Sequence, residues 1–138
     1  MIVREATASD EPRVRQLFAQ GDEKFKNAPA IFRAHDVNFM LEALRAGRVL
    51  VAEKDGSVRG MVMYVAGPPP YAMLAGLVVD EAARGNGAGA KLVQAAHTLA
   101  GARGATRALL MIFNGAQVQG FYEGQGYHQI GQILEAPL

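Results

Sequence analysis

Residues 71–90 read YAMLAGLVVDEAARGNGAGA, an apolar run followed by a glycine-rich turn. The apolar run, which ends at Val79, predicts a buried strand, and the residues from Gly87 onward predict a helix. Glycines in such a turn adopt conformations closed to other residues and let a ligand approach the main chain. The first amides of the helix would point outward and could donate to an anion. The stretch therefore predicts a phosphate-binding turn, with a plain strand-to-helix connection as the alternative.

The sequence on either side predicts further strands and helices. The predicted strands are residues 2–6, 49–53, 58–66, 72–79, 105–113 and 127–134. The predicted helices run from a cap at Ser9 to Gly21, from Asp36 to Gly47, from 87 to 103 and from 116 to 125. Asp55-Gly56 is a strong signal for a two-residue hairpin turn. Hairpins followed by helical crossovers imply an α+β (three-layer α/β/α) fold, with helices on both faces of a mixed, largely antiparallel sheet of about six strands.

Length and composition indicate a single domain over residues 1–138. Half of the residues are hydrophobic and 20% are charged, so the chain can bury a proper core. The formal net charge of +1 does not indicate a nucleic-acid partner or an anionic membrane. The absence of cysteine excludes disulfides, thiolate zinc sites and a cysteine nucleophile, and the three widely spaced histidines imply no metal. Charge from Arg4 onward leaves no apolar signal-peptide core, so a cytoplasmic location is expected.

A stretch of twenty uncharged residues, 60–79, is long enough to cross a bilayer. Three consecutive prolines, Pro68 to Pro70, stand in its middle, and a helix cannot continue through them. We therefore expect two strands joined by a proline connector, and no membrane association. A proline-rich ligand for a partner domain is the alternative interpretation of the connector.

Charge is unevenly distributed along the chain. Residues 82–122 contain no acidic side chain and carry a net charge of +4, whereas the remainder carries −3. A positive segment that starts at an amide-lined turn suits a ligand with several phosphates. The alternative is that these basic residues are simply solvated on helix faces.

Two familiar nucleotide-binding patterns are incomplete in the glycine-rich turn. Gly85, Gly87 and Ala90 satisfy the GxGxxA form of the dinucleotide fingerprint, but no acidic residue follows about twenty positions later. Lys91 is not followed by Ser or Thr, as a Walker-type loop requires. Adenine dinucleotides and nucleoside triphosphates are therefore disfavoured as ligands. A dinucleotide oxidoreductase is accordingly less favoured than the two functions described below.

Two ordered signatures resemble those of the GCN5-related N-acetyltransferases. Arg84, Gly87 and Gly89 match the Q/R-x-x-G-x-G/A pattern of that family, after a strand whose Leu77 and Val79 match L-x-V. Residues 121–127, FYEGQGY, are similar to the F-Y-E-x-x-G-Y/F segment of the family's last helix and the strand after it. The opening residues 2–10 are also similar, and the convincing resemblance covers about residues 71–128.

The resemblance implies an acyl-CoA N-acyltransferase fold and an N-acetyltransferase that uses acetyl-CoA as cosubstrate. Main-chain groups of Leu77, Val78 and Val79 would pair with the pantetheine arm, and an amide near Val79 would face the thioester oxygen. Gly76 is itself a sign of a bulge or of close packing. The implied cofactor-binding set is Leu77, Val78, Val79, Arg84, Gly85, Asn86, Gly87, Ala88, Gly89, Ala90, Asn114 and Tyr122.

Tyr122 occupies the position of the family's general acid. A phenol with a pKa of about 10 can protonate a departing thiolate. A tyrosine that only packs in the core is the alternative. The resemblance implies direct transfer from acetyl-CoA to a primary amine in a ternary complex, and no covalent enzyme intermediate is expected without cysteine.

The chain departs from the family pattern at several positions. Ala75 stands where many relatives have a glutamate base, so the base is unassigned; His35, Glu53 and a water chain are candidates. Asn114 lies one residue out of register, with Gly115 in the usual asparagine position. A non-catalytic acyl-CoA-binding regulatory module is therefore the second hypothesis.

The family usually has two strands after the position of residue 127, whereas this sequence leaves room for one, the predicted strand 127–134. An exposed sheet edge is expected there, and a homodimer could cover it.

Overall fold

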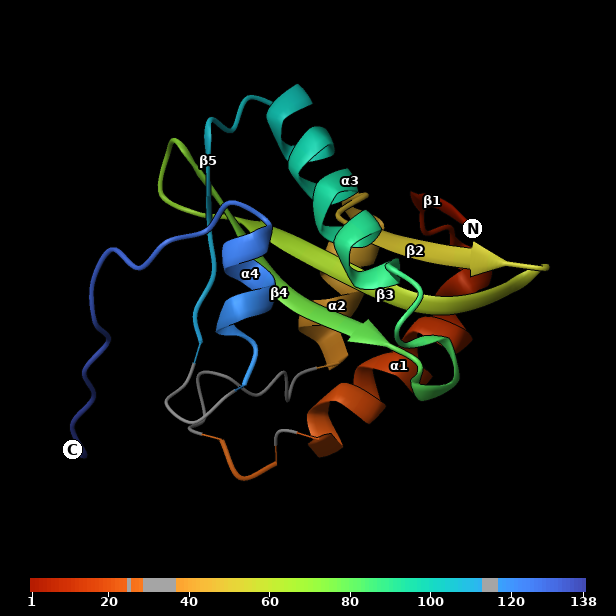
Figure 1. The fold of residues 1–138 in the computed structure, drawn as a ribbon, viewed down its shortest axis with the longest axis horizontal. Helices are drawn as coiled ribbons and strands as arrows, with labels where there is room; N and C mark the ends of the chain where they lie inside the picture. The colour runs from red at the N-terminus through yellow and green to blue at the C-terminus, as the bar shows by residue number, and fades with distance from the viewer. Residues whose placement is uncertain (25, 29–36, 113–116) are drawn as a thin grey trace.

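The centre of the molecule is a five-stranded sheet in the order β1-β2-β3-β4-β5 (Figure 1). The computed structural model describes residues 1–24, 26–28, 37–112 and 117–138. The strands are β1 (Ile2–Glu5), β2 (Val49–Lys54), β3 (Ser57–Ala66), β4 (Tyr71–Val79) and β5 (Arg107–Leu109). The first four strands pair antiparallel, and β5 is parallel to β4. The sheet is thus mixed and largely antiparallel, as predicted.

Helices cover both faces of this sheet (Figure 1). They are α1 (Glu11–Lys24), α2 (Val37–Arg45), α3 (Ala88–Ala102) and α4 (Gln119–Gly124), with short 3-10 turns at η1 (Ala8–Asp10) and η3 (Glu81–Ala83). Helices α1 and α2 pack on one face, and α3 packs on the other. The predicted three-layer architecture is confirmed.

Strand alternation builds the two cores. In β2, Val49 and Val51 face α1 and α2, whereas Leu50 and Ala52 face α3. Successive side chains of a strand point to opposite faces, so a strand buried on both sides is apolar throughout. This is why the central strands contain few charges.

Two hairpins join the central strands as predicted. Asp55 and Gly56 both have positive φ, 52° and 78°, which suits the two-residue turn between β2 and β3. The proline connector joins β3 to β4, and the Tyr71 amide donates to the Pro68 carbonyl at 2.9 Å. The Pro70 carbonyl accepts the amides of Thr106 and Arg107 at 3.0 and 3.3 Å, so the connector also starts the contact between β4 and β5. No helix in the described part of the chain is both long and apolar enough to cross a bilayer.

The predicted sixth strand, residues 127–134, is wrong. Residues 128–138 form no strand and are exposed, including Ile130 and Leu134 at 70% and 89% exposure. Ile133 and Leu134 are adjacent, so a strand here would point them to opposite faces and mix each with glutamine or glycine. Neither face would bury much apolar area. The segment instead extends away from the sheet beyond α4 (Figure 1).

Three predicted boundaries also need correction. Strand β5 ends at Leu109, well before residue 113, because its ladder with β4 stops there. Helix α4 starts at Gln119, whereas the predicted start at 116 lies outside the described residues. Helix α1 continues past Gly21 to Lys24. Gly21 does not end the helix but allows it to pack closely on β4, since a Cβ at this position would lie 2.6 Å from Val78 Cγ2.

The predicted Ser9 cap is replaced by Thr7 and Asp10. Thr7 precedes the 3-10 turn that leads into α1, and its amide donates to the Asp10 carboxylate at 2.7 Å. Asp10 also accepts two hydrogen bonds from Arg4, at 2.7 and 3.0 Å. These bonds hold the pKa of the Asp10 carboxyl down at about 2 and tie the start of α1 to β1.

Candidate functional site

Strand β4 contains the irregularity that Gly76 suggested. Met63 of β3 pairs with Gly76, but the next residue, Tyr64, pairs with Leu74, so Ala75 is extra. Ala75 packs against the α1–α2 core, and a Cβ on Gly76 would lie 3.4 Å from Met63 Cε in that same core. Two consecutive residues therefore face one side, which is a β-bulge. The bulge at Ala75 and Gly76 lies three to four residues before Val79, near which the resemblance implies an amide that faces the thioester oxygen.

Beyond its first three residues, β4 is open on the side of β5. Residues Tyr71 to Met73 pair with Arg107 to Leu109, and no described strand pairs with the rest of β4 on that side. Among the described residues, Leu74 to Val79 thus have no strand partner on that side, and such an edge could pair with an extended ligand. The Val79 carbonyl is already engaged, because Arg84 Nε donates to it at 3.1 Å.

The glycine-rich turn follows β4 directly and leads into α3. Gly85 and Gly87 have φ of 85° and 76°, in the left-handed region that favours glycine. No side chain caps the helix at Gly87, and the Lys91 amide makes the first helical bond, to the Gly87 carbonyl at 3.1 Å. The amides of residues 88–90 have no partner within the helix, as at any helix start. Ala88 is buried, whereas Gly89 and Ala90 are partly exposed, so the turn offers main-chain donors next to the open edge of β4 at these two residues.

The four basic residues of the positive segment are not gathered at this turn. Arg84 bonds back to β4, and Arg103 lies at the far end of α3, where it pairs with Glu5 at 2.8 Å. Lys91 points from α3 towards the start of β1, and Arg107 lies on β5. An anion at the turn would therefore meet main-chain amides more than side-chain charge.

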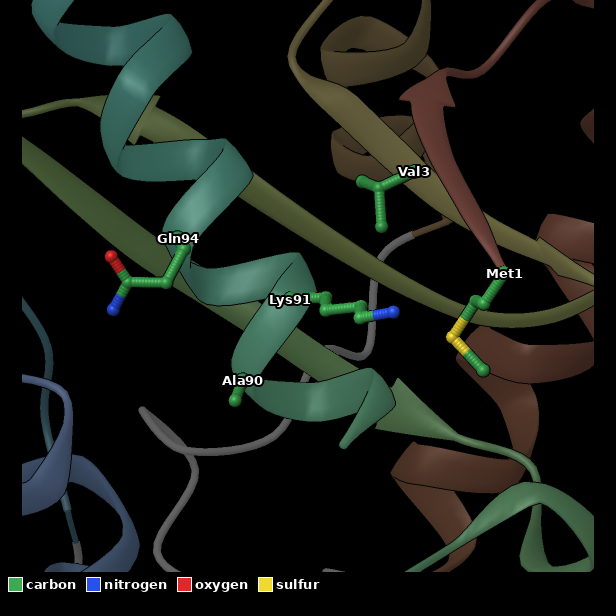
Figure 2. A pocket seen from close by; sticks show the side chains of 5 residues that line it. All are labelled: Met1, Val3, Ala90, Lys91 and Gln94. Atoms are coloured by element: carbon green, nitrogen blue, oxygen red, sulfur yellow. The ribbon is translucent and has the colours of Figure 1, made fainter. Parts of the chain in front are cut away.

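Figure 2 shows the hollow into which Lys91 points. The hollow is shallow, open to solvent and about 450 Å³ in volume, and is lined by Met1, Val3, Ala90, Lys91 and Gln94. It lies between α3 and β1, whereas α4 lies on the other side of α3. It shares Ala90 with the glycine-rich turn, but it lies on the opposite side of α3 from α4.

Gly89 is where these three elements meet. A Cβ on Gly89 would lie 3.3 Å from Phe121 Cζ and 3.9 Å from Leu77 Cδ2. The absence of a side chain thus lets the Phe121 ring of α4 sit against the first turn of α3 and beside β4. Gly89, the second glycine of the signature, thus permits close packing of Phe121. Because Tyr122 follows Phe121 in the same helix, this packing also places Tyr122 near the turn and β4.

The FYEGQGY signature encodes the end of α4. The Gly126 amide donates to the Glu123 carbonyl at 3.0 Å, and the Tyr127 amide donates to the Tyr122 carbonyl at 3.1 Å. Gly126 has φ of 97°, and the ring centroids of Tyr122 and Tyr127 lie 5.8 Å apart, edge to face. These bonds, the left-handed glycine and the contact between the two rings together form a Schellman motif.

Tyr122 is half-buried, and burial raises the pKa of its phenol. None of the described residues forms a hydrogen bond with its hydroxyl. At neutral pH the phenol is therefore protonated and able to donate to a ligand.

Sequence reasoning missed two residues of α3 that contact the end of α4. His97 Nε2 and the Tyr127 hydroxyl form a hydrogen bond of 2.7 Å, and Gln94 Nε2 donates to Gln125 Oε1 at 2.7 Å. Burial lowers the pKa of His97, and burial together with the nearby Tyr122 raises the pKa of Tyr127. The spacing of 94 and 97 on one helix face was the available signal.

One further candidate, Glu53, lies away from the site. Glu53 pairs with Arg4 at 2.9 Å on β2, away from the open edge of β4. His35, Asn114 and Gly115 lie outside the described residues. Within the described ranges, no group of three or more histidines and carboxylates could hold a metal ion.

Solved structures share this architecture. A ribosomal-protein-alanine N-acetyltransferase from Brucella melitensis is 25% identical, with a TM-score of 0.76 over 95% of this chain and 86% of that one. A Mycobacterium tuberculosis protein in complex with CoA is 23% identical, with a TM-score of 0.77 over 95% and 74% of the two chains. An aminoglycoside N-acetyltransferase in complex with CoA is 15% identical, with a TM-score of 0.78 over 99% and 98%. A comparison with curated proteins finds no match.

The family profile agrees with the signatures and with the fold. The sequence profile of the acetyltransferase (GNAT) family matches residues 12–127, which include the bulged strand, the glycine-rich turn and the Tyr122 helix. The five-stranded sheet and its helices match the fold of a solved N-acetyltransferase with a TM-score of 0.76. The chain therefore belongs to the acetyltransferase (GNAT) family.

Proposed function

We propose that residues 1–138 act as one domain that transfers the acetyl group of acetyl-CoA to a primary amine, by direct attack in a ternary complex. The observation that carries the proposal is the junction at Gly89. There the uncapped start of α3, the open edge of β4 and the Tyr122 helix come together. Two of the solved structures with this fold hold CoA, which supports acetyl-CoA as the cosubstrate.

Each element would have its own part in binding. The amides of residues 85–90 would donate to the pyrophosphate, because glycines leave the main chain of the turn accessible. Main-chain groups of Leu77, Val78 and Val79 would pair with the amide groups of the pantetheine arm along the open edge. Asn86 and Arg84 border the same turn and complete the proposed binding surface, and Asn114 belongs to it by resemblance.

Tyr122 would be the general acid. Its protonated phenol has no partner among the described residues, so it is free to donate to the thiolate that leaves when the amine attacks the carbonyl carbon. An amide near Val79 would donate to the thioester oxygen as negative charge develops on it. The amine proton passes to a base that remains unassigned.

One observation favours a second candidate, a non-catalytic acyl-CoA-binding module. At the bulge, Ala75 packs its methyl group against the apolar core of α1 and α2, where it provides no proton acceptor. A domain that had kept the binding turn and lost its base would look the same. Turnover separates the two candidates, because the module would bind CoA without releasing thiol from acetyl-CoA.

Binding is tested by thermal unfolding with CoA and with NAD. A ligand at 100 times its Kd stabilises the folded state by about 2.7 kcal/mol, so CoA should raise Tm and NAD should not. Gly87→Val should abolish the CoA shift by deforming the turn. Gly56→Val is the matched control, because Gly56 also has positive φ and open space around it but lies in the distant hairpin. If folded Gly87→Val keeps the CoA-induced rise in Tm, the glycines are needed only for the conformation of the turn and not for CoA binding.

Catalysis is tested by Tyr122→Phe, which removes the hydroxyl and keeps the ring. Thiol release from acetyl-CoA is followed with the best acceptor from a panel of amines and peptide amino termini. General acids contribute about 10² to 10⁴ in rate, so kcat should fall by at least about tenfold even if water substitutes, with CoA affinity unchanged. An unchanged kcat, with chemistry shown to be rate-limiting, would make Tyr122 a packing residue. A matching loss of CoA affinity would make its hydroxyl a binding group.

A further inference from the structure

Helix α4 has no buried side chain, and in the described part of the chain its contacts with α3 are one aromatic contact and two hydrogen bonds. Phe121 packs against Gly89, as described above. The other two contacts are the hydrogen bonds between Gln94 and Gln125 and between His97 and Tyr127, both 2.7 Å long. The Gln94–Gln125 pair is exposed, whereas the His97–Tyr127 pair is partly buried.

A continuous set of contacts leads from His97 to Tyr122. The Tyr127 hydroxyl bonds to His97 Nε2, and the ring centroids of these two residues lie 5.4 Å apart. The Tyr127 ring meets the Tyr122 ring edge to face at 5.8 Å, and its amide donates to the Tyr122 carbonyl at 3.1 Å. Tyr127 therefore contacts Tyr122 through both its ring and its main chain.

His97 is well placed to act as the fixed end of this set. Its neighbours Ala96 and Ala100 are buried against the sheet, so α3 is held by the core. The imidazole lines a cavity of about 240 Å³, together with Arg107 and the small side chains of Ala72, Ala96, Ala100 and Ala108. Within the described ranges, the Tyr127 hydroxyl is the sole hydrogen-bond partner of the imidazole.

We propose that His97 is a positioning residue, which holds Tyr122 at the site by anchoring the Tyr127 hydroxyl to α3. The inference rests on the proposed role of Tyr122 as general acid. Proton transfer needs the donor within hydrogen-bond reach of the acceptor, and displacements of about 1 Å can cost 100-fold in rate. A six-residue helix without core anchorage needs such a tether, whereas α3 does not.

The first test removes the hydrogen bond and keeps both rings. Tyr127→Phe should lower kcat about three- to tenfold, the range expected for one hydrogen bond, and leave CoA affinity unchanged. His97→Leu should lower kcat to the same extent, and His97→Gln, which can bond to the hydroxyl, should recover part of it. Amide exchange of residues 122–127 should quicken in the first two variants. His128→Gln is the control, because His128 is an exposed histidine beside Tyr127.

The second test repeats these changes in the Tyr122→Phe background. If His97 acts through the Tyr122 hydroxyl, Tyr127→Phe and His97→Leu should not lower kcat further once that hydroxyl is absent. A further fall of the same size would show a general structural role and overturn the proposal, as would unchanged kcat in the single variants. Failure of the acid role itself would be seen separately, as full activity of Tyr122→Phe alone.

Discussion

Helices α2 and α4 are both short, but they are held in place by different forces. Four of the nine residues of α2 are buried, namely Met40, Leu41, Ala43 and Leu44. None of the six residues of α4 is buried, and its position depends on one aromatic contact, a Schellman motif and two hydrogen bonds to α3. Burial stabilises α2 through non-directional apolar contacts, whereas directional contacts place α4 and stabilise the fold little. The helix proposed to do chemistry is the one that is positioned rather than buried.

The largest expected effect on stability lies in the core that α2 shares with α1. Leu17 is completely buried there, so Leu17→Ala should lower the free energy of unfolding by about 2–5 kcal/mol. The rate per folded molecule should be unchanged, because no contact of the Tyr122 helix is altered. Denaturant unfolding and thiol release measure the two quantities. A loss of rate in the remaining folded protein would show that the two regions are coupled.

A smaller effect is expected at the start of α1, where charge and hydrogen bonds add to burial. Asp10→Asn should cost about 1–3 kcal/mol, because it removes the carboxylate that accepts two hydrogen bonds from Arg4 and leaves Glu53 as the charged partner of that arginine. The Asp10 pKa falls from 3.8 to about 2 on folding, so the native protein should lose stability as pH drops from about 4 to 2. Asp10→Asn should remove that part of the acid dependence. The free energy of unfolding of both proteins is measured from about pH 4 to 2. If it falls equally in the wild type and in Asp10→Asn, the lowered pKa of Asp10 is contradicted.

The contrast between a helix held by burial and a helix held by directional contacts can be tested directly on α3 and α4, because each is followed by a glycine with similar geometry. Gly104 follows α3 with φ of 103°, and Gly126 follows α4 with φ of 97°. Alanine in this conformation costs about 1 kcal/mol. Gly104→Ala should lower global stability by that amount and spare kcat. Gly126→Ala should barely change global unfolding, but it should quicken amide exchange in α4 and lower kcat. The reverse pattern would mean that α4, and not α3, carries stability.

The same contrast explains how far the sequence could predict the structure. Apolar periodicity and the Asp55-Gly56 turn correctly indicated β2, β3, β4 and α3, because burial on a face leaves a repeating pattern. The apolar residues near the end of the chain misled, since Ile133 and Leu134 suggested a strand although they cannot share a face. The spacing of Gln94 and His97 indicated a shared helix face, but no pattern joined His97 to Tyr127, because these two residues are thirty positions apart and only the fold brings them together.

The glycine-rich turn also says something about how such a site can diverge during evolution. If the ligand meets main-chain donors, then the exposed side chain of Asn86 is free to change, provided that the residues with positive φ stay glycine and Ala88, which is buried, stays small. Selection then acts on backbone shape rather than on side-chain identity. We expect distant relatives to keep the turn as a sparse set of glycines while the sequence around it changes almost completely, so that a common ancestry is easier to see in the fold than in an alignment.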